Sequence, residues 1–139
     1  MFMENKREKG TASVEFALIL PMLLLMLFLI IEFSIILYDK AVITNASREG
    51  ARSGIVYSSP PRVNVGAITA TVNTYCASNL ISFGLDTPVT AVPNGACVNP
   101  GDLLRVNVTY TYSFFVLPKF LSMNSGGLTL TGNTVMRCE

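Results

Sequence analysis

The chain has 139 residues, of which half are hydrophobic and 14% are charged, against about 25% charged in an ordinary soluble domain. This length fits one domain, or a membrane anchor followed by one small domain. The net charge of +1 excludes a strong general attraction to nucleic acid. The absence of histidine removes the commonest general base and metal ligand.

The first predicted element is a long apolar helix that follows a basic leader. Lys6, Arg7 and Lys9 lie in the leader, and the apolar run from Val14 to Tyr38 measures roughly 37 Å as a helix at about 1.5 Å per residue. That length spans a hydrocarbon core of about 30 Å. The basic leader favours a cytoplasmic N-terminus, with the rest of the chain outside. A cleaved secretory signal is the competing interpretation, but its apolar region would be only about 7–15 residues long.

The carboxylate of Glu15 lies one turn into the apolar helix, near the start of the apolar run. An unpaired carboxylate at such a depth costs about 2.5–3.5 kcal/mol on insertion scales. Cleavage after Gly10 would create a free amine on Thr11, and Glu15 would then pair with that amine on a neighbouring subunit. The alternative is that Glu15 extends back to the lipid headgroups.

The segment Lys-Arg-Glu-Lys-Gly-Thr-Ala-Ser-Val-Glu-Phe resembles the processing site of type IV pilins and pseudopilins. The resemblance implies that a prepilin peptidase, a membrane aspartic peptidase, cleaves after Gly10. Thr11 is then the new N-terminus, and Glu15 with Phe16 forms the assembly position.

Beyond the span, the sequence resembles the helix of TadE-like pseudopilins, which accompany the short Flp pilin in tight-adherence pili. The matching features are the pair Glu32-Phe33, then Tyr38, then the run from Asn45 to Arg52. The chain is much longer than the major Flp pilin, so the resemblance implies a minor pseudopilin.

The same helix carries features for packing. Glu32 lies near the outer interface, where it either extends toward the headgroups or pairs with a cation on a neighbour. Ala46, Gly50 and Gly54 are spaced by four residues, which allows close approach of another helix, although Gly54 is also a candidate helix end. Pro21 is expected to bend the helix.

The part after residue 56 predicts a small α+β unit. A second helix is expected from Arg62, because five apolar residues recur at intervals of three and four: Val65, Ile68, Val72, Cys76 and Leu80. A short strand fits residues 89–92. Alternating apolar and polar residues predict a strand over 105–114, and another fits 128–137, with Gly132 as a bulge or weak point. Residues 114–120 are either a loop packed on the core or a contact patch.

The three cysteines all follow the apolar run. By position, Cys76 and Cys97 form the best disulfide pair, with a contribution of about 3 kcal/mol. Cys138 is the alternative partner for either, and free buried thiols are also possible. Without histidine or paired Cys-x-x-Cys spacing, a zinc site is not expected.

These observations predict an α+β fold in three regions: a cytoplasmic leader (1–10), a long helix (11–56) with its membrane span at about 14–38, and an exported domain (57–139). The resemblance implies a single-pass inner-membrane protein with its N-terminus in the cytoplasm. It also implies a minor pilin that acts in pilus assembly, adhesion or surface attachment and that can be incorporated into a cell-surface pilus.

The expected partners are the membrane, a prepilin peptidase, other pilin subunits and the assembly platform. We expect no catalytic, cofactor or metal site, no small-molecule substrate and no nucleic acid partner. The alternative function is a single-pass membrane protein with an exported binding domain and no role in a pilus.

Overall fold

The computed structural model describes residues 5–56, 64–82, 89–95, 97–114 and 127–139, without the side chains of 5–9, 90 and 92. The elements in chain order are α1 (Asn5–Ile55), α2 (Val65–Asn79), β1 (Thr90–Asn94), β2 (Leu103–Tyr112) and β3 (Leu128–Arg137). The three strands form one antiparallel sheet in the order β1-β2-β3. The structure thus confirms the predicted α+β fold.

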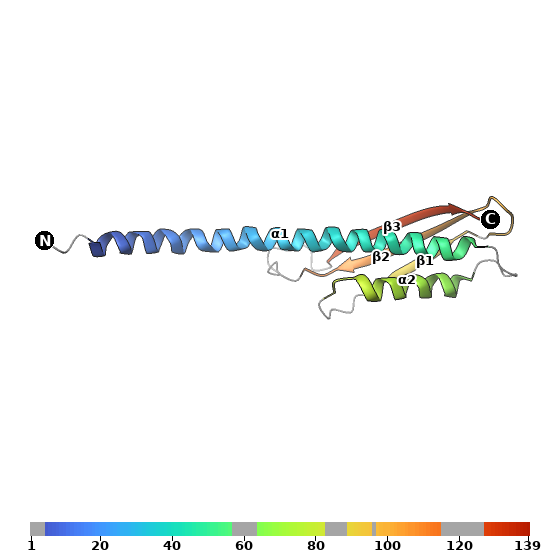
Figure 1. Cartoon of the computed structure of the whole chain (residues 1–139), viewed down its shortest axis with the longest axis horizontal. Helices are drawn as coiled ribbons and strands as arrows, with labels where there is room; N and C mark the ends of the chain where they lie inside the picture. The colour runs from blue at the N-terminus through green and yellow to red at the C-terminus, as the bar shows by residue number, and fades with distance from the viewer. Residues whose placement is uncertain (1–4, 57–63, 83–88, 96, 115–126) are drawn as a thin grey trace.

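The helix α1 is one continuous helix that extends far beyond the rest of the molecule (Figure 1). It begins at Asn5, inside the expected leader, and so earlier than the start expected at Thr11. Pro21 lies within the helix, which continues on both sides of it.

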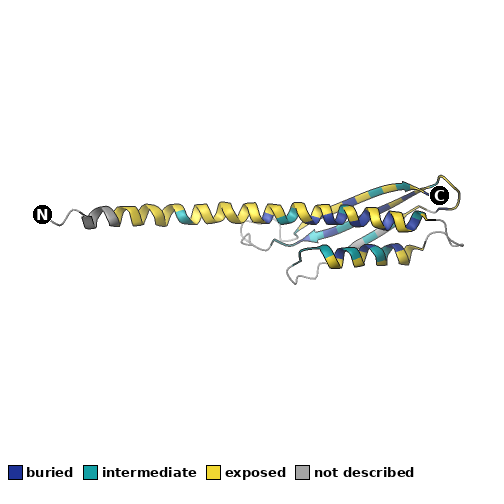
Figure 2. Ribbon diagram, in the orientation of Figure 1, coloured by how far each residue is buried: buried dark blue, intermediate teal, exposed yellow. Residues whose placement is uncertain are grey.

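The two halves of α1 differ in burial, as Figure 2 shows. Residues 10–31 are exposed, apart from the half-buried Leu20, and we name them the free segment. From Glu32 on, α1 packs against β2, β3 and α2. We name this second half of α1, together with α2 and the sheet, the head. The second half of α1 therefore shares one core with the unit predicted after residue 56.

The predicted second helix is confirmed as α2. The side chain of Asn64 caps its N-terminus by accepting a hydrogen bond from the Ala67 N–H at 3.1 Å. Ile68, Val72 and Cys76 form the buried stripe, whereas Val65 is 54% exposed. Apolar residues at these intervals lie on one helix face, which explains why the pattern identified the helix.

The strand β2 shows the predicted alternation. Every second side chain of β2 is buried in the core: Leu104, Val106, Val108, Tyr110 and Tyr112. The strand β3 adds Leu130. Four strand boundaries differ from the prediction: β1 begins at Thr90 and ends at Asn94, and β2 begins at Leu103 and ends at Tyr112. Phe114 lies beyond the strand and packs edge-on against Tyr112, with ring centroids 5.9 Å apart. The rest of segment 114–120 lies outside the described residues.

The predicted bulge at Gly132 is wrong. The pairing of β2 with β3 runs without interruption through Val108 and Gly132. The glycine is required for a different reason. A Cβ atom at this position would lie 2.6 Å from the backbone oxygen of Ile43 on α1. Gly132 therefore allows the helix backbone to lie directly on the strand.

Candidate functional site

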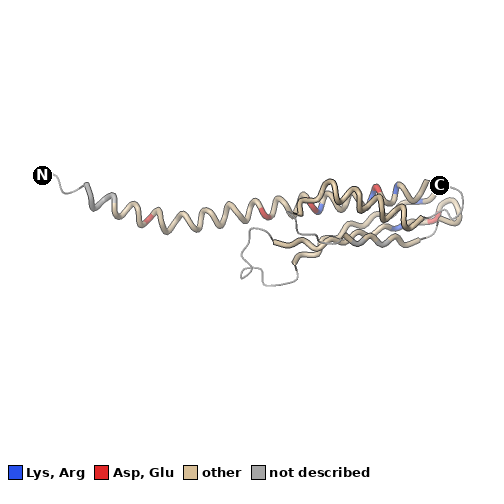
Figure 3. Tube along the Cα trace, turned by 90° about the horizontal axis from the view of Figure 1, so that it is seen from below, with Lys and Arg blue, Asp and Glu red and all other residues tan. Residues whose placement is uncertain are grey.

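The predicted processing and assembly residues all lie on the free segment, away from the head. Gly10, Glu15 and Phe16 are exposed, Phe16 by 62%. A Cβ atom added at Gly10 would meet no atom within 4 Å. Thr11 and Glu15 are four residues apart, which places them on neighbouring turns of one helix face. Figure 3 shows that charged residues are sparse along the free segment and gather on the head.

The head meets the free segment at a buried carboxylate. Glu32 is 1% exposed, and the Tyr112 hydroxyl donates a hydrogen bond of 2.6 Å to its Oε1 atom. Neither expectation for Glu32, extension toward the headgroups or a cation on a neighbour, describes this contact. Burial, the hydrogen bond to Glu32 and the charge of Glu32 raise the pKa of Tyr112, so the phenol stays protonated and remains a donor. From the sequence, Tyr112 was only one of the alternating residues of the strand predicted over 105–114.

A second buried carboxylate lies two helical turns further along α1. Asp39 is fully buried, and its Oδ1 atom accepts a hydrogen bond of 3.1 Å from the Ile81 N–H, just beyond α2. Its Oδ2 atom has no hydrogen-bond partner within the described part of the chain. Burial raises the pKa of Asp39, and the Ile81 N–H opposes this shift. Asp39 was not among the predicted site residues, although its spacing of seven residues from Glu32 places both on one helix face.

The small residues of α1 lie in the part of the helix that packs against α2. Ala46 and Gly50 are buried, and a Cβ atom at Gly50 would lie 2.5 Å from the Cγ2 atom of Val72. A Cβ atom at Gly54 would lie 2.6 Å from the Cδ1 atom of Ile68. At Gly50 and Gly54, the helix that lies this close is α2 of the same chain. Gly54 lies inside α1, which ends at Ile55.

The disulfide joins Cys97 to Cys138, with Cα atoms 5.5 Å apart, and Cys76 is free and buried. The favoured pairing of Cys76 with Cys97 is therefore wrong, and the alternative partner forms the bond. Cys97 lies near the carbonyl of Gly54, at the end of α1. The backbone of Cys138 exchanges hydrogen bonds with Gly101 and Asp102, which brings the end of β3 to the same place. Cys76 lies elsewhere, near the C-terminal end of α2.

The free thiol of Cys76 is not a reactive group. Burial raises its pKa to about 11, so it is protonated near neutral pH. No group of three or more potential metal-ligating residues occurs among the residues described.

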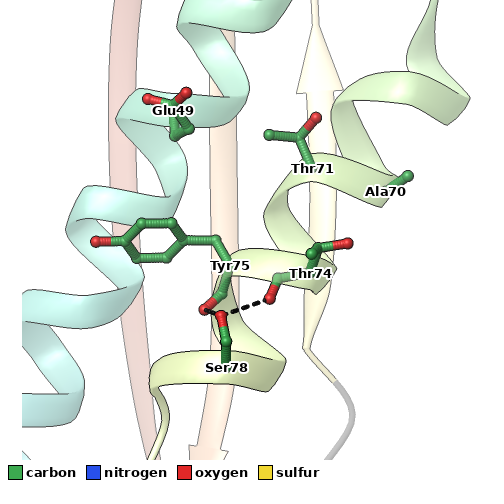
Figure 4. A pocket seen from close by; sticks show the side chains of 6 residues that line it. All are labelled: Glu49, Ala70, Thr71, Thr74, Tyr75 and Ser78. Carbon is green, nitrogen blue, oxygen red and sulfur yellow. Dashed lines mark hydrogen bonds between the residues drawn. The ribbon is translucent and has the colours of Figure 1, made fainter.

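A groove between α1 and α2 is the remaining feature of the head (Figure 4). Its volume is about 480 Å³, and it is open to the surface. Its lining residues are Glu49 from α1, and Ala70, Thr71, Thr74, Tyr75 and Ser78 from α2. The only charged group among them is the carboxylate of Glu49.

Comparison with protein families found that residues 10–52 match the family described as "TadE-like protein". This match confirms the predicted resemblance over that segment, which runs from Gly10 through the free segment into the head. It indicates a protein associated with the Tad pilus and the membrane. Neither the curated proteins nor the solved structures contained a match to the chain. The match leaves α2 and the sheet uncovered.

One helix of the described chain, in its Gly10–Ile55 portion, is long and apolar enough to cross a membrane, and an 18-residue stretch within it has a mean hydropathy of 2.8. This agrees with single-pass insertion.

Proposed function

We propose that this chain is a minor pilin of the tight-adherence pilus, held in the membrane by its free segment and processed after Gly10 by a prepilin peptidase. One observation carries the proposal: the TadE-like match begins at Gly10, the residue before the proposed cleavage, and includes the whole free segment. The exposed Gly10 presents its peptide bond without any contact to the head.

The length of the free segment supports the anchoring role. Residues 10–31 measure roughly 33 Å as a helix at about 1.5 Å per residue, close to a hydrocarbon core of about 30 Å. This segment is shorter than the span expected at 14–38, because the head already covers α1 at Glu32. The membrane face then coincides with the buried junction between Glu32 and Tyr112.

The position of Glu15 supports assembly as the outcome of processing. Within a bilayer its carboxylate is costly, and a counter-charge relieves that cost. Cleavage after Gly10 supplies such a charge as the amine of Thr11. The resemblance to pilins implies that the amine of one subunit meets the Glu15 carboxylate of the next.

The head has a structural role in this proposal, not a catalytic one. Its two buried carboxylates are used within the fold: Glu32 binds Tyr112, and Asp39 binds the backbone of Ile81. The head is placed outside the cytoplasm, in agreement with its disulfide, because disulfides persist in oxidising compartments.

Replacement of Gly10 by leucine tests the proposal. The added side chain has open space in the folded chain, so the variant is expected to fold and to insert. Since a bulky residue replaces the residue before the cleaved bond, the variant should remain full-length, whereas the unaltered chain should lose ten residues. The measurement is N-terminal sequencing and intact mass of the protein from cells that contain the pilus system.

Ala17→Leu is the matched control, because Ala17 is an exposed residue of the same helix. It should be shortened like the unaltered chain. A Gly10→Leu protein that still begins at Thr11 would exclude processing at this site. An unaltered protein that begins at Met1 would favour the alternative, a single-pass membrane protein with an exported binding domain.

A further inference from the structure

The groove between α1 and α2 has a charge without a counterpart. Glu49 forms no ion pair with any basic residue in the described ranges. The opposite wall is uncharged: the Thr71 and Ser78 hydroxyls donate to carbonyls of their own helix, at 2.9 Å each. Tyr75 extends from α2 toward α1 across the groove (Figure 4). A carboxylate beside an aromatic ring is a suitable site for a guanidinium group.

The exposed face of α1 beside the groove carries the complementary charge. Arg48 and Arg52 are exposed, and neither forms an ion pair within the described residues. Neighbouring helical residues are separated by about 100° around the axis and about 1.5 Å along it. Arg48 and Glu49 therefore lie at almost the same height, on opposite flanks of the exposed face.

Two copies of this chain meet with a defined orientation. Both are anchored through the same apolar free segment, so their α1 helices run parallel. When two parallel helices face each other at equal height, one flank of the first lies against the opposite flank of the second. This relation brings Glu49 of each copy to Arg48 of the other, as in the flanking charge pairs of parallel coiled coils.

We propose that the groove of one chain receives the Arg48 guanidinium of a second, parallel copy at the same height, with the reciprocal pair formed on the other side. The inference rests on the proposed membrane anchoring, since it needs two copies at equal height, side by side in one membrane. Because both pairs are solvent-accessible, they set register and partner choice more than affinity.

Photo-crosslinking in native membranes tests this contact on the full chain. A photoreactive amino acid replaces Thr74, an exposed residue that lines the groove. Irradiation should give an adduct of two copies whose crosslinked peptide contains residues near Arg48. The matched control places the same amino acid at Asn133, exposed on the outer face of the sheet, and should give little of this adduct.

Charge reversal then tests the pair itself. Arg48→Glu and Glu49→Arg should each lower the yield of the two-copy adduct by roughly tenfold, because both reciprocal pairs become repulsive. The double variant should restore it. Restoration by Arg52→Glu in the Glu49→Arg background, and not by Arg48→Glu, would overturn the equal-height register.

Two other results would overturn the proposal: an adduct only with a different protein, and no adduct at Thr74 while the chain is folded and inserted. The mature N-terminus is determined in the same samples. A two-copy adduct on a chain that still begins at Met1 would leave this contact standing and exclude the processing step.

Discussion

Gly132→Ala offers the most direct test of how the head is built. The added Cβ atom would meet three backbone atoms of α1, the nearest being the Ile43 oxygen at 2.6 Å. Ordinary contact begins at 3.4 Å, so α1 and β3 must separate by about 0.8 Å. A backbone cannot rotate away as a side chain can, so the helix itself has to move.

The neighbouring contacts define the cost of that movement. The Ser47 and Thr134 hydroxyls lie 2.7 Å apart, and the same separation would extend this hydrogen bond to about 3.5 Å, where it is lost. The ammonium group of Lys40 donates to the Thr131 carbonyl across the same interface. Overpacking costs about 1–3 kcal/mol and a lost hydrogen bond about 1 kcal/mol. We therefore expect the free energy of unfolding to fall by roughly 2–4 kcal/mol, out of a typical 5–15 kcal/mol.

The assay is urea unfolding of the full chain in a mild non-ionic detergent, followed by the near-ultraviolet circular dichroism of the buried Tyr110 and Tyr112. Asn133→Ala is the control, because Asn133 is exposed on the same strand and should change stability by no more than about 0.5 kcal/mol. A Gly132→Ala protein as stable as this control would refute the close approach of α1 to β3.

Two further predictions concern the interior of the head. Because burial raises the pKa of Asp39 above its unfolded value, its contribution to stability is lost as pH rises through the folded-state pKa. Asp39→Asn should therefore be more favourable, relative to the unaltered chain, at pH 8 than at pH 4. The measurement is the difference in urea midpoint between the two proteins at each pH. An equal difference at pH 8 and pH 4 would contradict this prediction. Cys97→Ala opens the bond to Cys138, 41 residues away, and should cost about 2–5 kcal/mol in the same urea assay. Cys76→Ala should cost no more than about 1 kcal/mol, and a larger loss there than at Cys97 would contradict the observed pairing.

Local patterns were sufficient for the elements of this protein. The stripe of Ile68, Val72 and Cys76 identified α2, and the alternation along residues 105–112 identified β2, because both periodicities follow from backbone geometry alone. The Gly10–Glu15 pair and the run from Asn45 to Arg52 likewise identified the TadE-like segment, which the family match over residues 10–52 confirms. Strand ends moved by one or two residues, since pairing partners decide where a strand begins and stops.

Contacts between residues far apart in the chain were decided only by the tertiary structure. Glu32 and Tyr112 are 80 residues apart, and nothing in either segment indicates that the hydroxyl meets the carboxylate. Gly132 reads as a weak point of its strand, yet its missing side chain admits the backbone of α1. Cys97 and Cys138 meet because antiparallel pairing brings the end of β3 beside the start of β2. Periodicity encodes which face of an element is buried, but not what that face meets.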